Sequence, residues 1–162
     1  MTRPGRRRRQ PDTDWLDGDQ QRAWRQILSM IMELPAALES DLQRTTGLTT
    51  FEYLVLANLS EADEMTLRMS ELAARANSSL SRLSHVVSRL EGNGLVIKRS
   101  CADDGRVSVV ELTKAGKKRV AAAAPFHVAK VRELVVDPLT RAELISLGKA
   151  AEAITDRIAE SG

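Results

Sequence analysis

Apolar residues recur every three or four positions along the first part of the chain, which is the spacing of one helix face. Residues 19 to about 44 are therefore predicted to form a helix, which Pro35 is expected to kink or break. The apolar positions of this helix are Trp24, Ile27, Leu28, Ile31, Leu38 and Leu42. Gly47 ends the pattern, and Thr49 with Glu52 predicts a capping box at the start of a second helix.

The middle of the chain alternates between short helices and extended segments. Ser70 is expected to cap a brief helix and Ser79 a longer one that ends near Gly92, with a turn at Asn77–Ser78 between them. The extended segments are Met65–Met69, Leu95–Arg99 and Val107–Leu112. The last two flank a polar turn over 102–105, which predicts a β-hairpin directly after the longer helix.

After Thr113 the pattern is helical to the end of the chain. One helix is expected over Val120–Val135, with a kink at Pro125 and an end at Asp137–Pro138. Thr140 and Glu143 predict a second capping box before a final helix. The apolar positions of that helix are Leu144, Leu147, Ala151, Ile154 and Ile158. The fold class is thus mainly α with a small β-hairpin, and because aromatic residues make up only 3% of the chain, the core must be aliphatic.

Charge is unevenly distributed along the 162 residues, although the net charge is only +2. Five arginines with no acidic residue among them lie in the first nine positions: Arg3, Arg6, Arg7, Arg8 and Arg9. Residues 1–17 cannot build a core and are predicted to be a disordered tail. The tail either adds non-specific attraction to phosphates or is solvated without a role. The rest of the chain is slightly acidic, so binding to a polyanion requires a local patch.

The segment Leu72–Glu91 has the layout of a helix-turn-helix, and its second helix has two unlike sides. One side carries Leu80, Leu83, Val86, Val87 and Leu90. The other carries Ser81, His85 and Ser88, flanked by Arg82 and Arg89, with no carboxylate before Glu91. This face suits the major groove of DNA, because serine and arginine bond to base edges and phosphates, and the amides near Ser79 suit a phosphate. The alternative is an ordinary amphipathic surface helix.

The predicted hairpin carries its own basic residues near the tip. Lys98 and Arg99 precede the tip and Arg106 follows it, in the position of an arginine that enters a minor groove. Asp104 is close enough in sequence to hold the Arg106 guanidinium in a fixed pose. The alternative is that the acidic residues only form a good turn and that the charges keep an edge strand soluble.

The runs LAARANSSLSRLSHVVSRLEGNGLVIKR and DDGRVSVVELTKAG together resemble the MarR family of bacterial regulators. The resemblance covers Leu72–Gly116 by motif and about 19–161 by element order. Its most specific residues are Asp104, Arg106, Leu112, Thr113 and Gly116. The chain departs from the pattern at Gly105, where members commonly carry a second arginine, and this weakens the expected charge of the hairpin.

The resemblance implies a winged helix-turn-helix homodimer that binds a palindromic operator in double-stranded DNA. It implies four segments: the tail 1–17, an N-terminal dimerisation helix 18–46, the DNA-binding domain 47–113 and C-terminal dimerisation helices 114–162. The implied base-reading residues are Ser79, Ser81, Arg82 and His85. Arg106 becomes the arginine of the wing and Asp104 its partner. Arg89 and Lys98 complete the predicted DNA-binding set.

The resemblance also implies repression that a small aromatic or anionic ligand relieves. By their elements, Trp24, Leu28, Leu54 and His127 are the candidate ligand-binding residues. All four are also typical of core or interface positions, and for His127, which follows an apolar residue, a satisfied core histidine is the more common case. The sequence favours this second interpretation.

No catalytic or metal-binding pattern is apparent, and no cofactor is expected. The two histidines and the single cysteine, Cys101, lack metal-ligand spacing, and the glycines near position 93 end a helix where a phosphate loop would begin one. Nearby Lys98 and Arg99 would lower the thiol pKa of a redox-active Cys101, but a small residue without a role is the simpler interpretation. The single cysteine, the missing signal peptide and the absence of a long apolar span predict a cytoplasmic protein with no membrane association.

Two other functions remain open from the sequence. One is a ligand-independent DNA-binding protein with an architectural role. The other is a protein-interaction module that uses the winged fold as a docking surface.

Overall fold

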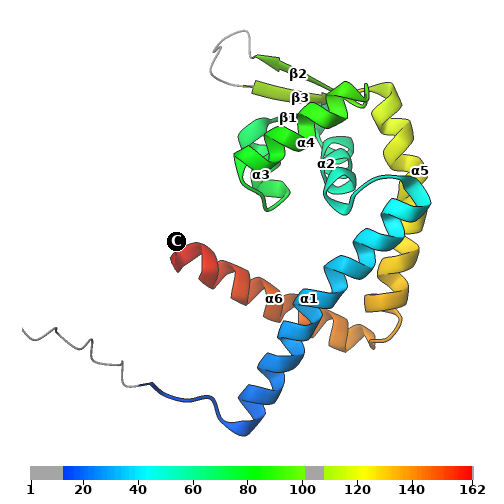
Figure 1. Cartoon of the computed structure of the whole chain (residues 1–162). Coiled ribbons are helices and arrows are strands. Elements are labelled where there is room, and N and C mark those ends of the chain that lie inside the picture. The colour runs from blue at the N-terminus through cyan, green and yellow to red at the C-terminus, as the bar shows by residue number, and fades with distance from the viewer. Residues whose placement is uncertain (1–12, 101–107, 162) are drawn as a thin grey trace, which may run out of the picture. The chain divides into compact units, whose positions relative to one another are not determined.

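The computed structural model describes residues 13–100 and 108–161 and is mostly helical (Figure 1). Its elements are α1 (Gly18–Thr46), α2 (Thr50–Glu61), η1 (Asp63–Met65), β1 (Thr66–Arg68), α3 (Met69–Arg75), α4 (Leu80–Gly92), β2 (Val96–Ser100), β3 (Ser108–Leu112), α5 (Lys114–Val131), η2 (Arg132–Val136) and α6 (Arg141–Ser161). The chain divides between Pro35 and Ala36 into two compact units, which are described separately below.

The first unit holds the N-terminal part of α1. Both tryptophans of the chain lie here and are exposed, Trp15 by 83% and Trp24 by 49%. The helix runs from Gly18 to Thr46 with Pro35 inside it, so the expectation of a break there is wrong. A proline removes one backbone donor, but the turns on either side still close their own hydrogen bonds.

Short polar caps fix where the helices of the second unit begin. The predicted capping box of α2 is confirmed, since the Thr49 side chain accepts from the backbone N of Glu52 while the Glu52 carboxylate accepts from the backbone N of Thr49. Ser79 is confirmed as the N-cap of α4. The predicted cap at Ser70 is wrong, because α3 follows β1 without a spacer and its N-cap is Arg68, which makes no side-chain cap bond.

Three antiparallel strands form the sheet in the order β1-β3-β2, as expected for a winged helix. Val110 of the central strand is fully buried and lies opposite Leu67 on one side and Lys98 on the other. Figure 1 shows the β2–β3 hairpin beside α4. The hairpin tip, with Cys101, Asp104 and Arg106, lies outside the described residues, as does the N-terminal part of the arginine-rich tail.

The core of the second unit is aliphatic, which confirms the expectation from composition. Its largest fully buried side chains are Leu42, Leu56, Leu59, Leu72, Leu83, Leu90, Val55, Val87, Val96 and Val110. Leu80 was expected on the buried side of α4 but is 54% exposed. It is the first residue of α4, and a helical side chain covers the turn before its own Cα, so it projects past the core.

Thr113 joins the base of the hairpin to α5. Its backbone N donates to the Leu95 carbonyl oxygen at 3.1 Å, its hydroxyl donates to the Gly94 carbonyl oxygen at 2.8 Å, and the same hydroxyl accepts from the Gly116 backbone N at 3.0 Å. This cap starts α5 at Lys114, so the helical pattern expected after Thr113 is confirmed, and the helix expected over Val120–Val135 begins earlier. Gly116 is buried so tightly that a Cβ atom there would lie 2.1 Å from the Leu95 carbonyl oxygen.

The final helix, α6, has no buried residue. Its capping box at Thr140 and Glu143 is confirmed. Its apolar side chains are largely exposed, among them Ile145, Leu147, Ile154 and Ile158. Within residues 13–100 and 108–161, no helix is long and apolar enough to cross a membrane.

Candidate nucleic-acid interface

The outer side of α4 is exposed and free of carboxylates. Ser81, His85 and Ser88 are all exposed, and Leu83, Val87 and Leu90 are buried on the opposite side. The sequence-based assignment of the two sides is therefore correct for these residues. The first carboxylate of the helix, Glu91, lies in its last turn, where Oε1 accepts from the Lys98 backbone N at 2.8 Å.

Two of the predicted side chains at the start of α4 already have partners within the protein. The Ser79 Oγ atom accepts from the Arg82 backbone N at 3.2 Å, which leaves its hydroxyl hydrogen and one lone pair for another partner. The Arg82 guanidinium lies over the Phe51 ring, with the carbon at its centre 4.4 Å from the ring centroid. This stacking orients the guanidinium while leaving its in-plane N–H donors available.

Arg89, on the same flank of α4, forms an ion pair with α2. Its Nε lies 2.8 Å from Oε1 of Glu52. The sequence identified Glu52 as a cap but missed this second contact, and it missed Phe51 entirely. A glutamate at an otherwise apolar, buried position was the available signal, since such a carboxylate needs a partner.

The described part of the hairpin carries two of the predicted basic residues, Lys98 and Arg99. The Arg99 guanidinium lies 3.1 Å from the Glu111 carboxylate on the neighbouring strand, and Lys98 is half-buried. Asp104 and Arg106 lie outside the described residues, so their pairing stays a prediction.

The four candidate ligand residues divide between the two units. Trp24 and Leu28 belong to residues 13–35, whereas Leu54 and His127 belong to the second unit. The His127 ring lies 4.5 Å from the Tyr53 ring, centroid to centroid. This contact fits the interpretation of His127 as a packed histidine.

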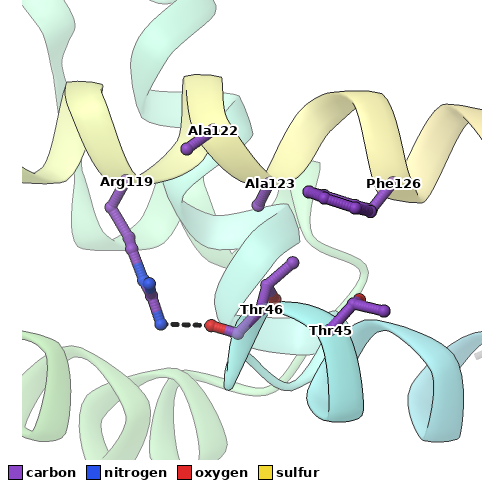
Figure 2. Close-up of a pocket in the computed structure, with 6 residues that line it drawn as sticks. All are labelled: Thr45, Thr46, Arg119, Ala122, Ala123 and Phe126. Carbon is purple, nitrogen blue, oxygen red and sulfur yellow. Dashed lines mark hydrogen bonds between the residues drawn. The ribbon is translucent and has the colours of Figure 1, made fainter.

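Two pockets of the second unit lie against α5. The larger, about 290 Å³, lies between α2 and α5, and neither Leu54 nor His127 lines it. Its lining is Tyr53, Ala57, Ser60, Glu61, Lys117, Val120, Ala121 and Ala124. Burial and the nearby Glu61 carboxylate raise the pKa of Tyr53, so the phenol stays protonated as a donor. The smaller pocket, about 120 Å³, is lined by Thr45, Thr46, Arg119, Ala122, Ala123 and Phe126, and the Arg119 guanidinium donates to the Thr46 carbonyl oxygen beside it (Figure 2).

The environment of His127 leads to a prediction about pH. Burial lowers the pKa of His127 below its ordinary value of 6.5, so at mildly acidic pH the unfolded chain binds more protons than the folded one. We expect the free energy of unfolding to be highest above about pH 6.5 and to fall as the pH is lowered from there. Urea denaturation between about pH 7.5 and about pH 5 measures this change. The His127→Gln variant should show a smaller change of the free energy of unfolding with pH. If stability depended on pH equally in the variant and the wild type, the assignment of this pH dependence to His127 would be contradicted.

Within the described ranges, no group of three or more His, Cys, Asp or Glu side chains could hold a metal ion. What the fold does assemble is a helix-turn-helix (α3 and α4) followed by an antiparallel hairpin, with a carboxylate-free outer side on α4. This combination defines a winged helix-turn-helix protein.

Comparison with known proteins identifies the family. The model of the MarR family matches residues 48–108. AbsC, a MarR family transcriptional regulator from Streptomyces coelicolor, is 39% identical, with 91% of this chain and 99% of that chain covered and a TM-score of 0.85. Sco3205, a MarR family regulator from the same organism solved in complex with DNA, is 37% identical, with 89% and 91% covered and a TM-score of 0.86. The chain belongs to the MarR family.

Curated relatives match over a shorter span. The HTH-type transcriptional repressor YetL of Bacillus subtilis is 31% identical over 85 residues, which are 52% of this chain and 51% of that protein. An uncharacterized HTH-type transcriptional regulator of the same organism, YxaD, is 36% identical over 81 residues. The matches span about half the length of these two relatives.

Proposed function

We propose that the protein is a dimeric, sequence-specific DNA-binding regulator of transcription that acts in the cytoplasm. The observation that carries this proposal is the exposed, carboxylate-free stripe of Ser81, His85 and Ser88, which α4 presents opposite its buried side. Such a stripe can donate to and accept from base edges in a major groove without repelling phosphates. The DNA complex of the relative Sco3205 supports the same class of ligand.

Dimerisation is supported by α6. This 21-residue helix has no buried side chain and an exposed apolar stripe, so packing within its own chain stabilises it little. A two-fold partner would cover that stripe and would set the two α4 helices about 34 Å apart, which suits a palindromic operator.

Repression relieved by a small ligand is the regulatory mode we propose. YetL, a relative, is named a repressor. The pocket between α2 and α5 has alanine walls, the Tyr53 phenol, the Lys117 ammonium and the Glu61 carboxylate, which suit a small aromatic ligand that carries both an acidic group and a hydrogen-bond donor. A ligand that binds better to the form unable to engage DNA would lower operator occupancy by shifting the population.

Selection of bound duplexes from a random pool, followed by measured affinity for the selected site, tests the DNA-binding proposal. We expect a palindromic site, and Arg82→Ala should weaken binding to it by about 1–3 kcal/mol and relax the choice of base. Arg106→Ala should weaken binding and reduce the salt dependence by about one unit. Absence of preference for any duplex would favour a protein-docking role, and binding that survives both substitutions would refute these site residues.

A further inference from the structure

Glu52 makes one contact more than a capping box needs. Its Oε2 atom accepts from the Thr49 backbone N at 2.8 Å and from the Thr49 hydroxyl at 2.9 Å, which completes the cap of α2. Its other oxygen, Oε1, forms an ion pair with Arg89 on α4, whose Nε lies 2.8 Å away. One carboxylate therefore fixes both the start of α2 and a side chain of the proposed DNA-contacting helix.

The second capping box of the protein shows that the arginine is not part of capping itself. At the start of α6, Glu143 accepts from the Thr140 backbone N at 2.8 Å and from the Thr140 hydroxyl at 2.7 Å. Glu143 is exposed and has no ion pair with any residue that the structure describes. The ion pair at Glu52 thus needs a separate explanation.

Burial is unequal across the pair of Glu52 and Arg89. The Glu52 side chain is 8% exposed and the Arg89 side chain 54% exposed. The buried carboxylate holds the arginine at Nε, the nitrogen nearest the chain. Among residues 13–100 and 108–161, neither Nη nitrogen of Arg89 has a hydrogen-bond acceptor, so their donors are left for a ligand outside the protein.

We propose that Glu52 is a positioning residue, which holds Arg89 so that its two Nη groups meet a phosphate of the DNA backbone. The inference rests on the proposed function, because it requires α4 to lie in a major groove. Arg89 lies in the last turn of α4, whereas recognition helices read bases mainly with their N-terminal residues. A phosphate can accept hydrogen bonds from both Nη groups of a guanidinium at once. Holding the guanidinium in place beforehand reduces the entropy lost on binding.

Glu52→Gln tests this proposal through the sign of its effect. Removing a negative charge would by itself strengthen attraction to DNA. Glutamine keeps the capping box, but once its single oxygen caps Thr49 its uncharged amide nitrogen, a donor, faces Arg89 and cannot replace the ion pair. We therefore expect about 5- to 10-fold weaker binding to the selected duplex, with unchanged base preference.

Glu143→Gln is the matched control. It makes the same change of charge and of cap at the other box, where no arginine is held. Affinity for the duplex should stay equal to that of the wild type or increase slightly. If Glu52→Gln and Glu143→Gln affect binding equally, the inference is overturned.

A double-mutant cycle separates positioning from a merely structural role. Fluorescence anisotropy with labelled duplex at several salt concentrations gives affinity and salt dependence for Glu52→Gln, Arg89→Gln and their combination. Arg89→Gln should reduce the salt dependence by about one unit and keep base preference, and Glu52→Gln should then cause no further loss of affinity. An equal loss from Glu52→Gln in both backgrounds, or altered base preference in Arg89→Gln, overturns the inference.

Arg89→Lys tests the same point without touching the cap. Lysine keeps the charge but lacks the guanidinium, which Glu52 can hold at Nε while a phosphate binds the two Nη groups. We expect about 5- to 10-fold weaker binding here too, and wild-type affinity would overturn the inference even if Glu52→Gln failed to fold. Failure of the wild type to bind any duplex would instead overturn the proposed function itself.

Discussion

The Gly116→Ala variant is expected to unfold at lower urea concentration than the wild type, with a net loss of about 2 kcal/mol in the free energy of unfolding. A methyl group at this position would lie 2.1 Å from the Leu95 carbonyl oxygen and 2.7 Å from Cδ1 of Leu112. The carbonyl cannot retreat without losing its hydrogen bond from the Thr113 backbone N. This clash outweighs the gain of about 1 kcal/mol that alanine brings within a helix.

Gly148→Ala provides the control for that measurement. Gly148 lies inside α6, and a Cβ atom there would meet nothing within 4 Å. Its substitution should raise stability by about 0.5–1 kcal/mol, because alanine reduces the entropy of the unfolded chain. Both variants should be compared at one protomer concentration, since stability of a dimer depends on it. Equal stability of the two variants would contradict the close packing of Gly116.

Ile154→Asp is expected to weaken self-association about 100-fold or more, as measured by sedimentation equilibrium. Ile154 is 51% exposed in the single chain and lies in the apolar stripe of α6. In a dimer that covers this stripe, the new carboxylate would be buried without a partner. Operator affinity should fall with it, because one protomer engages only one half-site.

Ala153→Asp introduces the same charge one residue away. At about 100° per residue, Ala153 lies on the other side of α6, away from the apolar stripe. Its variant should remain a dimer. A dimeric Ile154→Asp protein, or dissociation of both variants, would show that the stripe is not the interface.

Local chemistry explains which parts of the fold could be predicted from the sequence. The cap at Ser79, both capping boxes and the buried side of α4 depend on residues a few positions apart, so their patterns can be read directly. Asn77 was expected in a turn, and it has a left-handed φ of 46°. The errors at Pro35, Ser70 and Leu80 all concern where a helix begins or ends, which depends on the elements that it adjoins.

The contacts within the candidate site, in contrast, could not be predicted from local sequence patterns. The pattern of α4 identified Arg82 and Arg89 as exposed cations but could not show what holds them. Their partners, Phe51 and Glu52, lie 31 and 37 residues earlier in the chain, and only the tertiary fold brings the start of α2 within side-chain reach of α4. No local periodicity carries that information.

The placement of the two tryptophans determines what optical spectroscopy can report. Trp15 and Trp24 both lie in residues 13–35, and the remainder of the chain contains the single tyrosine, Tyr53. Intrinsic tryptophan emission therefore reports on residues 13–35, while the helices around the aliphatic core contribute almost no signal. A melting curve recorded by this emission and one recorded by far-ultraviolet circular dichroism will describe different parts of the molecule. A fluorophore attached to α4 would be needed to follow the DNA-contacting helix.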